Sequence, residues 1–395
     1  MNVKSIGAFA LGMLMLASCT SEDLKLTGGL NESSEYIPGN STYEIRLRGR
    51  ETATLTRAAI LGDSSVAVLD SMGIFALARE KQGTNQAAYD IQWFHDTRNW
   101  SFCIMNNVAA KMEHGNITWK EDTVFFYPIS QFYNYDFYGY YPYTDDITRY
   151  DNSIVAHYTI DGTNDIIWGR ATSDEDFAYS AKYYRTYGNL AKHPVVQLKH
   201  LLTRLTFSIE PGESAYGNGD YTDAEKMKVK SIQLCDVYTH LDVRVADREN
   251  IDEADWSNPD WYVSDYDARI STRDGLLDTL ILREENHDVM STVQVPLHVW
   301  VVNTNAGKGL HVGESVMLFP AEEYMVRVVV LDEENREHVS EIPLTLQSAL
   351  APTNPEKFRR GYSYNIRVIV HGPRAIALQG QLEPWNEVDG PELEL

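Results

Sequence analysis

Apolar and polar residues alternate along most of the chain downstream of residue 42. The first clear example is the segment 43–48, in which Tyr43, Ile45 and Leu47 alternate with charged residues. A period of two is typical of a β-strand that buries one face. Further strand signals occur at 65–69, 73–78, 100–105, 116–120, 123–127, 132–140, 154–160, 166–169, 195–198, 205–209, 229–237, 278–283, 293–302, 315–319, 323–331, 338–342, 362–371 and 375–382.

Helical periodicity is scarce in this sequence, and only the short segments 223–228 and 355–359 are helix candidates. Many short strands separated by turn signals predict an all-β fold made of sandwiches. The polar stretch 174–193 is the best candidate for a boundary. We therefore expect one β-sandwich at 43–192 and a second at 193–395, the latter ending in a C-terminal tail.

The N-terminal segment has the features of an export signal. A single cation, Lys4, precedes an apolar run from Ile6 to Leu16, which is too short to cross a bilayer. The run ends in Leu16-Ala17-Ser18-Cys19, which resembles a bacterial lipobox. This resemblance implies that residues 1–18 are a lipoprotein signal peptide and that Cys19 is lipidated. The alternative is a plain signal peptide with an ordinary cysteine nearby.

The residues that follow Cys19 favour a tethered surface protein. Residues 19–42 are polar and contain Gly28, Gly29 and Pro38, which predicts a flexible tether. The run Ser21-Glu22-Asp23 resembles surface-export signals of lipoproteins in Gram-negative anaerobes. The lipobox resemblance implies that Cys19 carries several acyl chains, which together anchor a protein firmly. We therefore expect a surface-exposed lipoprotein of the cell outer membrane, held in the outer-membrane lipid through Cys19.

The net charge of the chain bears on the class of partner that it is able to bind. The chain carries 57 acidic and 34 basic residues, a net charge of −23. This balance argues against nucleic acid as a partner, since nucleic-acid binding requires basic patches.

Besides Cys19, the cysteines are Cys103 and Cys235, both in apolar, strand-like stretches. An exported protein is able to hold a disulfide, but we expect two separate buried thiols.

Sequence motifs of catalysis are absent. The chain has no Gly-x-Ser-x-Gly, no His-Glu-x-x-His and no phosphate loop, and its histidines are not spaced as metal ligands. We therefore expect no enzymatic activity, no metal and no cofactor. The acidic clusters at 145–146, 174–176 and 332–334 are interpreted as solvated turns, with weak calcium binding as the alternative.

Aromatic residues are concentrated between Phe125 and Tyr143. Exposed aromatic rings are able to stack on sugar rings, so a glycan-binding face is one interpretation. The alternative is core packing, because Tyr135 and Phe137 share one face of a strand while Tyr138 and Tyr140 fall near the opposite face. Buried aromatic side chains dominate the energetics of cores, and we therefore favour the second interpretation.

Several runs along the chain form a recognisable set: the lipobox, the runs 137–143, 165–169 and 196–207, the Tyr362–Tyr364 strand and Pro384-Trp385. Together they resemble the fimbrillin family, the pilin-like lipoproteins of type V-like surface fimbriae in Gram-negative anaerobes. The resemblance implies two tandem transthyretin-like β-sandwiches. It also implies a route of assembly, in which a trypsin-like protease cuts after an N-terminal arginine and releases the first strand. A strand of another subunit then fills the groove.

The sequence contains residues that suit each step of this route. Tyr43, Ile45 and Leu47 fit the removable strand, and Arg57, with Arg50 next, is the candidate cleavage site. The alternative is that 43–48 is a permanent strand and Arg57 an ordinary loop arginine. Donor-strand candidates at the other end are Ile376, Leu378 and Leu382, with Gly380 in the intervening inward position. The alternative there is a last strand that belongs to its own domain.

The resemblance thus predicts a structural and adhesive subunit of cell-surface fimbriae, assembled by donor-strand insertion. Its partners would be other fimbrial subunits, the outer-membrane lipid and a host or bacterial surface ligand. The residues do not distinguish a stalk, tip or accessory subunit. The alternative function is a monomeric, glycan-binding surface lipoprotein.

Overall fold

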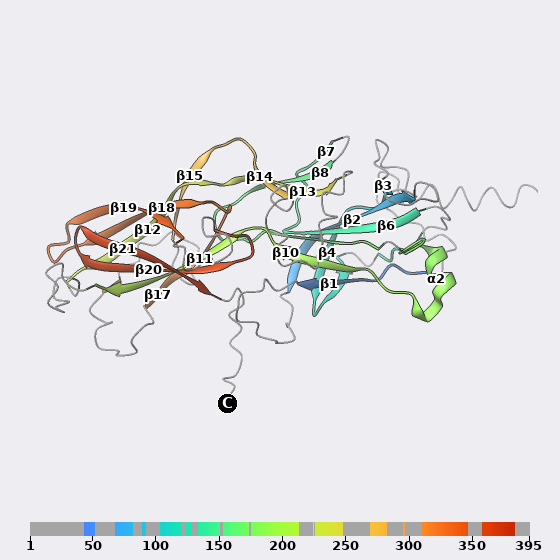
Figure 1. The fold of residues 1–395 in the computed structure, drawn as a ribbon, viewed down its shortest axis with the longest axis horizontal. Helices are drawn as coiled ribbons and strands as arrows, with labels where there is room; N and C mark the ends of the chain where they lie inside the picture. The colour runs from blue at the N-terminus through green and yellow to red at the C-terminus, as the bar shows by residue number, and fades with distance from the viewer. Residues whose placement is uncertain are drawn as a thin grey trace, which may run out of the picture.

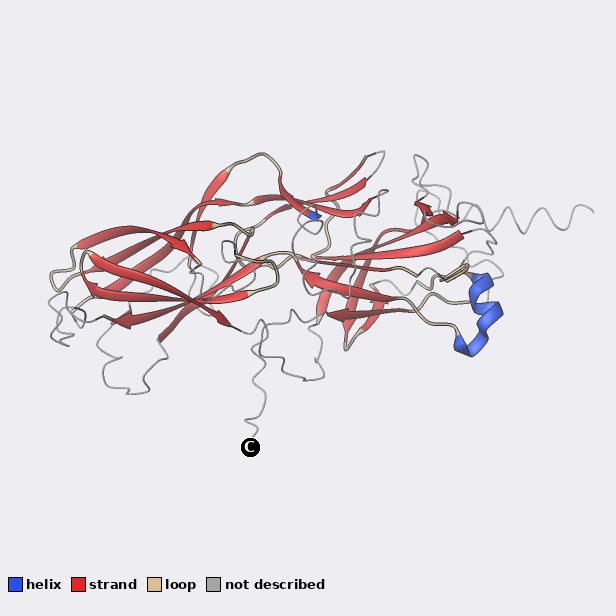
Figure 2. Ribbon diagram, in the orientation of Figure 1, coloured by secondary structure: helices blue, strands red, loops and turns tan. Residues whose placement is uncertain are grey.

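The computed structural model describes residues 43–51, 68–81, 89–91, 103–120, 123–127, 133–150, 153–173, 175–212, 224, 226–247, 269–282, 295–296, 310–346 and 358–383. Within these ranges the chain forms β-strands, one short helix, α2 (Ala181–Tyr187), and one 3-10 turn, Gly188–Leu190 (Figure 2). The all-β class predicted from the sequence is confirmed. The molecule is elongated, with a group of strands at each end and a further sheet along one side (Figure 1).

The first group is an eight-stranded sheet in the order β3-β2-β4-β5-β1-β10-β9-β6. Strand β2 also pairs with β6, so the strands other than β3 close into a ring. All described pairings in this ring are antiparallel except the one between β1 and β10. The strands are β1 (Leu47–Glu51), β2 (Leu69–Lys81), β3 (Tyr89–Ile91), β4 (Cys103–Glu113), β5 (Asn116–Trp119), β6 (Tyr133–Tyr141), β9 (Ile167–Ala171) and β10 (Val195–His200).

The burial of strand β6 on both of its faces explains why aromatic residues are concentrated there. Tyr135 and Phe137 belong to the apolar core inside the ring, and Tyr138 and Tyr140 belong to a second core on its outer face. A strand that is covered on both faces buries every side chain, and residues 134–140 are all buried. Core packing is therefore confirmed for these residues, and they are not available to stack on a sugar.

The second core lies beneath a four-stranded sheet in the order β14-β13-β8-β7, which runs along the side of the molecule (Figure 1). The Trp168 side chain is fully buried in this core, and its indole N–H donates to the Val245 carbonyl at 2.8 Å. The Arg269 guanidinium lies over the same indole ring, 4.5 Å from its centroid. The strands are β7 (Ile147–Arg149), β8 (Ser153–Thr159), β13 (His240–Asp247) and β14 (Ile270–Thr272).

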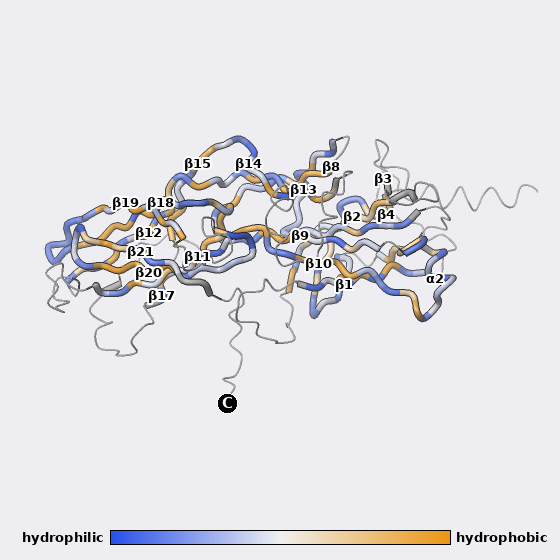
Figure 3. Tube along the Cα trace, in the orientation of Figure 1, coloured by the Kyte–Doolittle hydropathy of each residue, from blue (hydrophilic) through white to orange (hydrophobic). Residues whose placement is uncertain are grey.

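The second group is a sandwich of two sheets, β17-β11-β20-β21 and β15-β12-β18-β19, with β16 added beside β12. Apolar side chains of both sheets form one core, and Figure 3 shows apolar and polar positions alternating along these strands. The strands are β11 (Thr203–Pro211), β12 (Lys228–Tyr238), β15 (Leu277–Ile281), β16 (Val295–Pro296), β17 (Leu310–Leu318), β18 (Glu323–Leu331), β19 (Glu337–Thr345), β20 (Ser363–Gly372) and β21 (Ala375–Glu383).

Very short connections join the sandwich to the ring and to the side sheet. The buried Leu201 and Leu202 join β10 of the ring to β11 of the sandwich, and Thr239 alone separates β12 from β13. A division of the chain at 192/193 thus falls just before β10, which pairs with β1 and β9 of the ring. Similarly, β13 follows that division but pairs with β8, which precedes it.

Several described elements have no counterpart in the sequence analysis, namely the strands β3, β7, β13 and β14, the 3-10 turn and the helix α2. Strand β13 was not named, although Leu241, Val243 and Val245 alternate with polar residues and are buried. Helix α2 lies in the polar stretch expected to be a boundary. Its N-cap residue is Ser180, whose hydroxyl accepts a hydrogen bond from the Tyr183 backbone N–H at 3.2 Å. The helix candidates 223–228 and 355–359 each include residues outside the described ones.

Candidate functional site

The first described segment, 43–51, occupies a groove in the ring and is named here the N-terminal strand segment. Its β1 portion lies between β5, which it meets antiparallel, and β10, which it meets parallel. Leu47 lies opposite Ile117 on one side, and Glu51 lies opposite Leu198 on the other. The removal of β1 would leave β5 and β10 with unpaired edges and would open the ring.

Backbone hydrogen bonds hold this segment along its length. The Ile45 N–H donates to the Phe125 carbonyl at 2.8 Å, and the Tyr127 N–H donates to the Tyr43 carbonyl at 3.0 Å. Further along, the Arg48 N–H donates to Pro194 at 3.1 Å and the Gly49 N–H donates to Gly115 at 3.0 Å. The segment therefore lies within the sheet as an integral strand.

Alternate side chains of the segment enter the core. Ile45 is 2% exposed and Leu47 is 3% exposed, whereas Arg46 and Arg48 face the solvent. Burial of each aliphatic side chain stabilises the fold by roughly 1.5–3 kcal/mol. The exposed ion pair between Arg46 and Glu44, at 2.9 Å, adds little because solvent screens it.

Gly49 continues the inward series and lies unusually close to β4. A Cβ atom built on Gly49 would lie 2.1 Å from the Met112 sulfur and 3.3 Å from Leu198 Cδ1. The backbone of Gly49 does not adopt the left-handed conformation that favours glycine. A side chain at position 49 would therefore require the Met112 side chain to shift. The sequence analysis did not identify Gly49 or Met112, although Gly49 follows Leu47 at the strand spacing of two.

An aromatic cluster covers the beginning of the segment. The ring of Tyr43 stacks on Tyr184 of α2 at 6.1 Å, and Tyr184 stacks on Tyr127 at 4.9 Å. The Tyr184 hydroxyl donates to the Lys192 carbonyl at 3.0 Å, and burial raises its pKa to about 12. His193 stacks on Tyr184 at 5.6 Å. This cluster was missed because its members lie far apart in the sequence.

Charged groups fasten α2, and burial together with nearby charges lowers the pKa of the adjacent His193. The Tyr183 hydroxyl donates to Glu175 at 2.7 Å, and Lys192 pairs with the same carboxylate at 3.0 Å. These hydrogen bonds, that of Tyr183 first, hold the pKa of Glu175 below its usual value. Burial, followed by the charges of Arg46 and Arg48, lowers the pKa of His193.

Of the two candidate cleavage arginines, Arg50 lies within the described residues and Arg57 does not. Arg50 lies within β1, exposed and opposite Gln197 of β10. A protease needs an extended, unpaired backbone, so β1 must open before a cut after Arg50 is made. Arg57 lies outside the described residues, as do the signal peptide at 1–18, Cys19 and the tether at 19–42.

The donor-strand candidates lie in the second group, away from the groove in the ring. Ile376 and Leu378 are partly buried against the sandwich core, and Leu382 lies opposite Tyr364 of β20. Their strand, β21, is at the end of its sheet and pairs with β20 among the described strands. In this chain taken alone, β21 is therefore the last strand of its own sandwich.

Thiols and metal-ligating side chains are the other candidates for chemistry in the described part of the chain. Cys103 and Cys235 are both buried free thiols, as expected, and burial raises the pKa of Cys103 to about 12. Within the described residues, no three metal-ligating side chains gather into a group that would hold an ion. None of the described helices has the length and apolar character that a membrane crossing requires.

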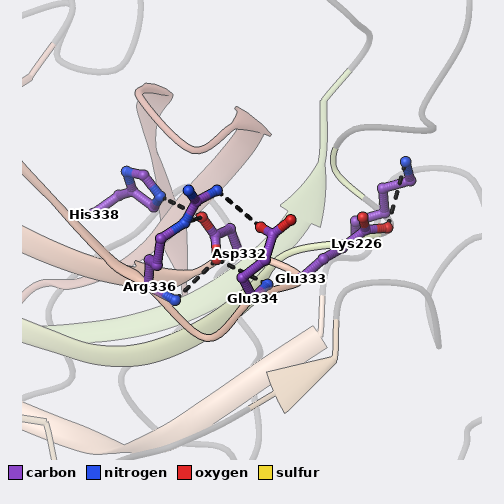
Figure 4. A network of polar contacts seen from close by, with 6 residues as sticks. All are labelled: Lys226, Asp332, Glu333, Glu334, Arg336 and His338. Atoms are coloured by element: carbon purple, nitrogen blue, oxygen red, sulfur yellow. Dashed lines mark hydrogen bonds and ion pairs between the residues drawn. The ribbon is translucent and has the colours of Figure 1, made fainter.

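The acidic turn at 332–334 forms a polar network between β18 and β19 (Figure 4). The Asp332 carboxylate accepts hydrogen bonds from His338 Nε2 at 2.9 Å and from Arg336 Nε at 2.8 Å. It also accepts from the Glu334 backbone N–H at 3.0 Å. These donors, that of His338 first, hold the pKa of Asp332 well below its usual value. Hydrogen-bond donors of the protein itself therefore satisfy the Asp332 carboxylate and hold the turn between β18 and β19 together.

Comparison with known proteins finds solved structures that are similar to this chain. Among similar solved structures is a fimbrial protein from Bacteroides vulgatus, 13% identical, with a TM-score of 0.45, covering 87% of this chain and 99% of its own. The fimbrial anchor protein Mfa2 from Porphyromonas gingivalis is 11% identical, with a TM-score of 0.34 and coverage of 87% and 98%. The C-terminally truncated tip fimbrial protein Mfa3 from the same organism is 10% identical, with a TM-score of 0.37 and coverage of 87% and 100%. No protein of curated function matches the sequence.

A sequence model described as fimbrillin-like matches residues 56–385, which is most of the chain. The resemblance stated from the sequence is therefore confirmed. Proteins of this kind are structural, so the expectation of a non-enzymatic fimbrial or adhesion subunit is confirmed as well. The chain belongs to the fimbrillin-like family.

Proposed function

We propose that this chain is a subunit of cell-surface fimbriae that polymerises by strand exchange at the groove of the N-terminal strand segment. In this proposal the precursor is exported as an outer-membrane lipoprotein through Cys19. An arginine-specific protease then cuts after Arg57, which frees the segment that contains β1. A strand of a second subunit takes its place between β5 and β10.

One observation carries this proposal: β1 is the connection that closes the ring between β5 and β10. Its loss would expose two rows of backbone donors and acceptors and would remove Ile45 and Leu47 from the core. An exposed sheet edge with an apolar slot is what an incoming strand repairs by β-augmentation. A partner strand that makes the same contacts would restore the free energy that β1 contributes to the fold.

The cut at Arg57 converts β1 from a covalently attached strand into a separate peptide. Before the cut, β1 returns to the groove faster than a partner arrives, because its effective concentration is high. After the cut, the released peptide is diluted and a partner strand competes for the groove. Arg57 suits this role better than Arg50, since a cut after Arg50 falls inside the paired strand.

The experiment compares the purified chain before and after treatment with a trypsin-like protease. We expect the cut chain to begin at Ala58 and to form ladders that resist SDS without boiling, because an inserted strand dissociates slowly. Arg57→Ala should abolish the new N-terminus and the ladders, while Arg50→Ala, the matched control, should retain both. A cut chain that stays monomeric and binds oligosaccharides would instead support the glycan-binding alternative.

A further inference from the structure

Residues 175–192 lie between the adjacent ring strands β9 and β10 and contain α2 (Figure 1). Hydrogen bonds join the two ends of this stretch. The Glu175 carboxylate pairs with the Lys192 ammonium at 3.0 Å and accepts a hydrogen bond from the Tyr183 hydroxyl at 2.7 Å. The Lys192 backbone N–H donates to the same hydroxyl at 3.3 Å. One tyrosine thus ties the beginning of the stretch to its end, and residues 175–192 are named here the clasp loop.

The clasp loop shares its core with the N-terminal strand segment. Its inward side chains belong to the cluster that also contains Ile45 and Leu47, and they are Ala178, Tyr179, Ala181, Tyr183 and Tyr184. The Tyr135 backbone N–H of β6 also donates to the Ala178 carbonyl at 3.1 Å. Because protein interiors are close-packed, movement of the loop disturbs the packing of the segment, and movement of the segment disturbs the packing of the loop.

Tyr184 carries the direct contact between the loop and the segment. Its ring stacks on Tyr43 at 6.1 Å and on Tyr127 at 4.9 Å. The Tyr127 backbone N–H donates to the Tyr43 carbonyl at 3.0 Å. Tyr43 is therefore held both at its ring and at its backbone. The segment leaves the groove only when the stacking of Tyr43 on Tyr184 breaks.

The docked conformation of the clasp loop is strained at two aromatic residues. The φ angle is 59° at Phe177 and 55° at Tyr179. In this left-handed region the Cβ atom crowds the following carbonyl oxygen, so bulky residues rarely adopt it. The Tyr179 ring packs on Phe137 at 6.1 Å and on Tyr183 at 6.4 Å. Strain of this kind persists only where surrounding contacts maintain it, so undocking of the loop would release it.

We propose that the clasp loop sets the rate at which the N-terminal strand segment leaves the groove. The docked loop, closed at its base through Tyr183, retains Tyr43 after the protease cut. The loop undocks and relaxes at Phe177 and Tyr179 as the segment departs. This inference rests on the strand exchange proposed above and adds a retention step to it.

Retention of the cut segment has a physical advantage. The departure of β1 exposes the edges of β5 and β10 and empties the positions of Ile45 and Leu47 in the core. An exposed sheet edge beside an apolar slot pairs with other chains without selection. A segment that leaves slowly keeps the groove covered until a partner strand competes for it.

The test measures how fast the N-terminal peptide dissociates from the protease-cut chain, by gel filtration and mass spectrometry at successive times. Tyr183→Phe keeps the ring and removes the hydroxyl that closes the loop, so release should become faster by about threefold or more. The matched control is Tyr158→Phe. It removes a hydroxyl that donates to the Pro142 carbonyl at 2.6 Å in the other core, and it should leave the release rate unchanged. Equal acceleration by both variants would overturn the clasp, because a general loss of stability would explain it.

A pair of variants at position 177 tests the strain. Phe177→Gly and Phe177→Ala both remove the ring and its contact with Lys182. Glycine adopts a positive φ without steric cost, whereas alanine retains the crowding of its Cβ atom. The docked loop is therefore more stable with glycine, and the glycine variant should release the peptide more slowly than the alanine variant by about threefold or more. Release from the glycine variant as fast as from the alanine variant would overturn the role of strain.

Amide hydrogen exchange of the uncut chain separates the clasp from strand exchange. The Ile45 N–H, which donates to the Phe125 carbonyl at 2.8 Å, should exchange faster in Tyr183→Phe by about threefold or more and should be unchanged in Tyr158→Phe. Faster exchange in a chain whose cut form makes no ladders would contradict the proposed function and support the clasp. Exchange and release in Tyr183→Phe that match the unaltered chain would overturn the clasp.

Discussion

Tyr43, at the start of the N-terminal strand segment, stacks on Tyr184 of helix α2 with their ring centroids 6.1 Å apart. Tyr184 also stacks on Tyr127, whose backbone N–H donates to the Tyr43 carbonyl. The helix thus fastens the first residue of the segment through one shared ring. The end of the segment nearest α2 is held by aromatic contact, and the β1 end is held by the sheet.

This contact leads to a prediction for Tyr184. Tyr184→Ala should lower the free energy of unfolding by about 3 kcal/mol, because a buried ring is removed from an aromatic cluster. Amide hydrogen exchange at Tyr43 to Leu47 should become faster. Tyr184→Phe keeps the ring and loses only the hydroxyl, which bonds to the Lys192 carbonyl and to the Tyr127 hydroxyl, so it should cost about 1–2 kcal/mol. Equal losses for the two variants would contradict the role of stacking.

The inward face of β1 should dominate its contribution to stability. Leu47→Ala should lower the free energy of unfolding by about 2–5 kcal/mol, since a buried side chain is replaced by a cavity. Arg48→Ala, the exposed neighbour, should change it by no more than about 0.5 kcal/mol. Urea unfolding of the uncut chain measures both. If the arginine variant were as unstable as the leucine variant, the assignment of faces would be wrong.

The Asp332 network should make stability depend on pH in the acid range. The folded state holds the pKa of Asp332 below its unfolded value. Its stabilisation is therefore complete above the unfolded pKa, about 4, and declines as the pH falls through the lower folded pKa. Asp332→Asn should melt at a lower temperature than the unaltered chain at pH 6. The gap between the two should narrow below about pH 4.

Glu333 supplies the control for this prediction, because it lies on the same turn and pairs with Lys226 at 3.4 Å while both side chains are largely exposed (Figure 4). Glu333→Gln should show little difference from the unaltered chain at either pH. A gap for Asp332→Asn that stayed constant from pH 6 to pH 2 would show that the carboxylate charge is not what stabilises the turn.

The two buried thiols should be unreactive in the folded chain. Burial raises the pKa of Cys103 to about 12, so almost no thiolate forms near neutral pH. With Cys19 replaced by serine, a thiol reagent should label neither Cys103 nor Cys235 until denaturant is added, and then should label both. Rapid labelling of the folded chain at Cys103 would contradict its burial.

The sequence pattern predicted the strands well where a strand buries one face and its alternation is clear. Residues 323–331 were predicted as a strand and form β18, and the inward positions 45 and 47 are buried as their spacing indicated. Helix α2 was missed because it is short and its apolar positions are tyrosines, which are also common in strands. Its cap at Ser180 was the one local signal.

The sequence by itself determined which residues share a face, because the side chains of a strand alternate whatever its neighbours are. Only the tertiary structure decided which strands pair, since the backbone edges that strands present to one another are chemically alike. The parallel contact of β1 with β10 joins residues from opposite ends of the ring's sequence. The contact between Gly49 and Met112 depends on the strand order β4-β5-β1, and no local pattern encodes it.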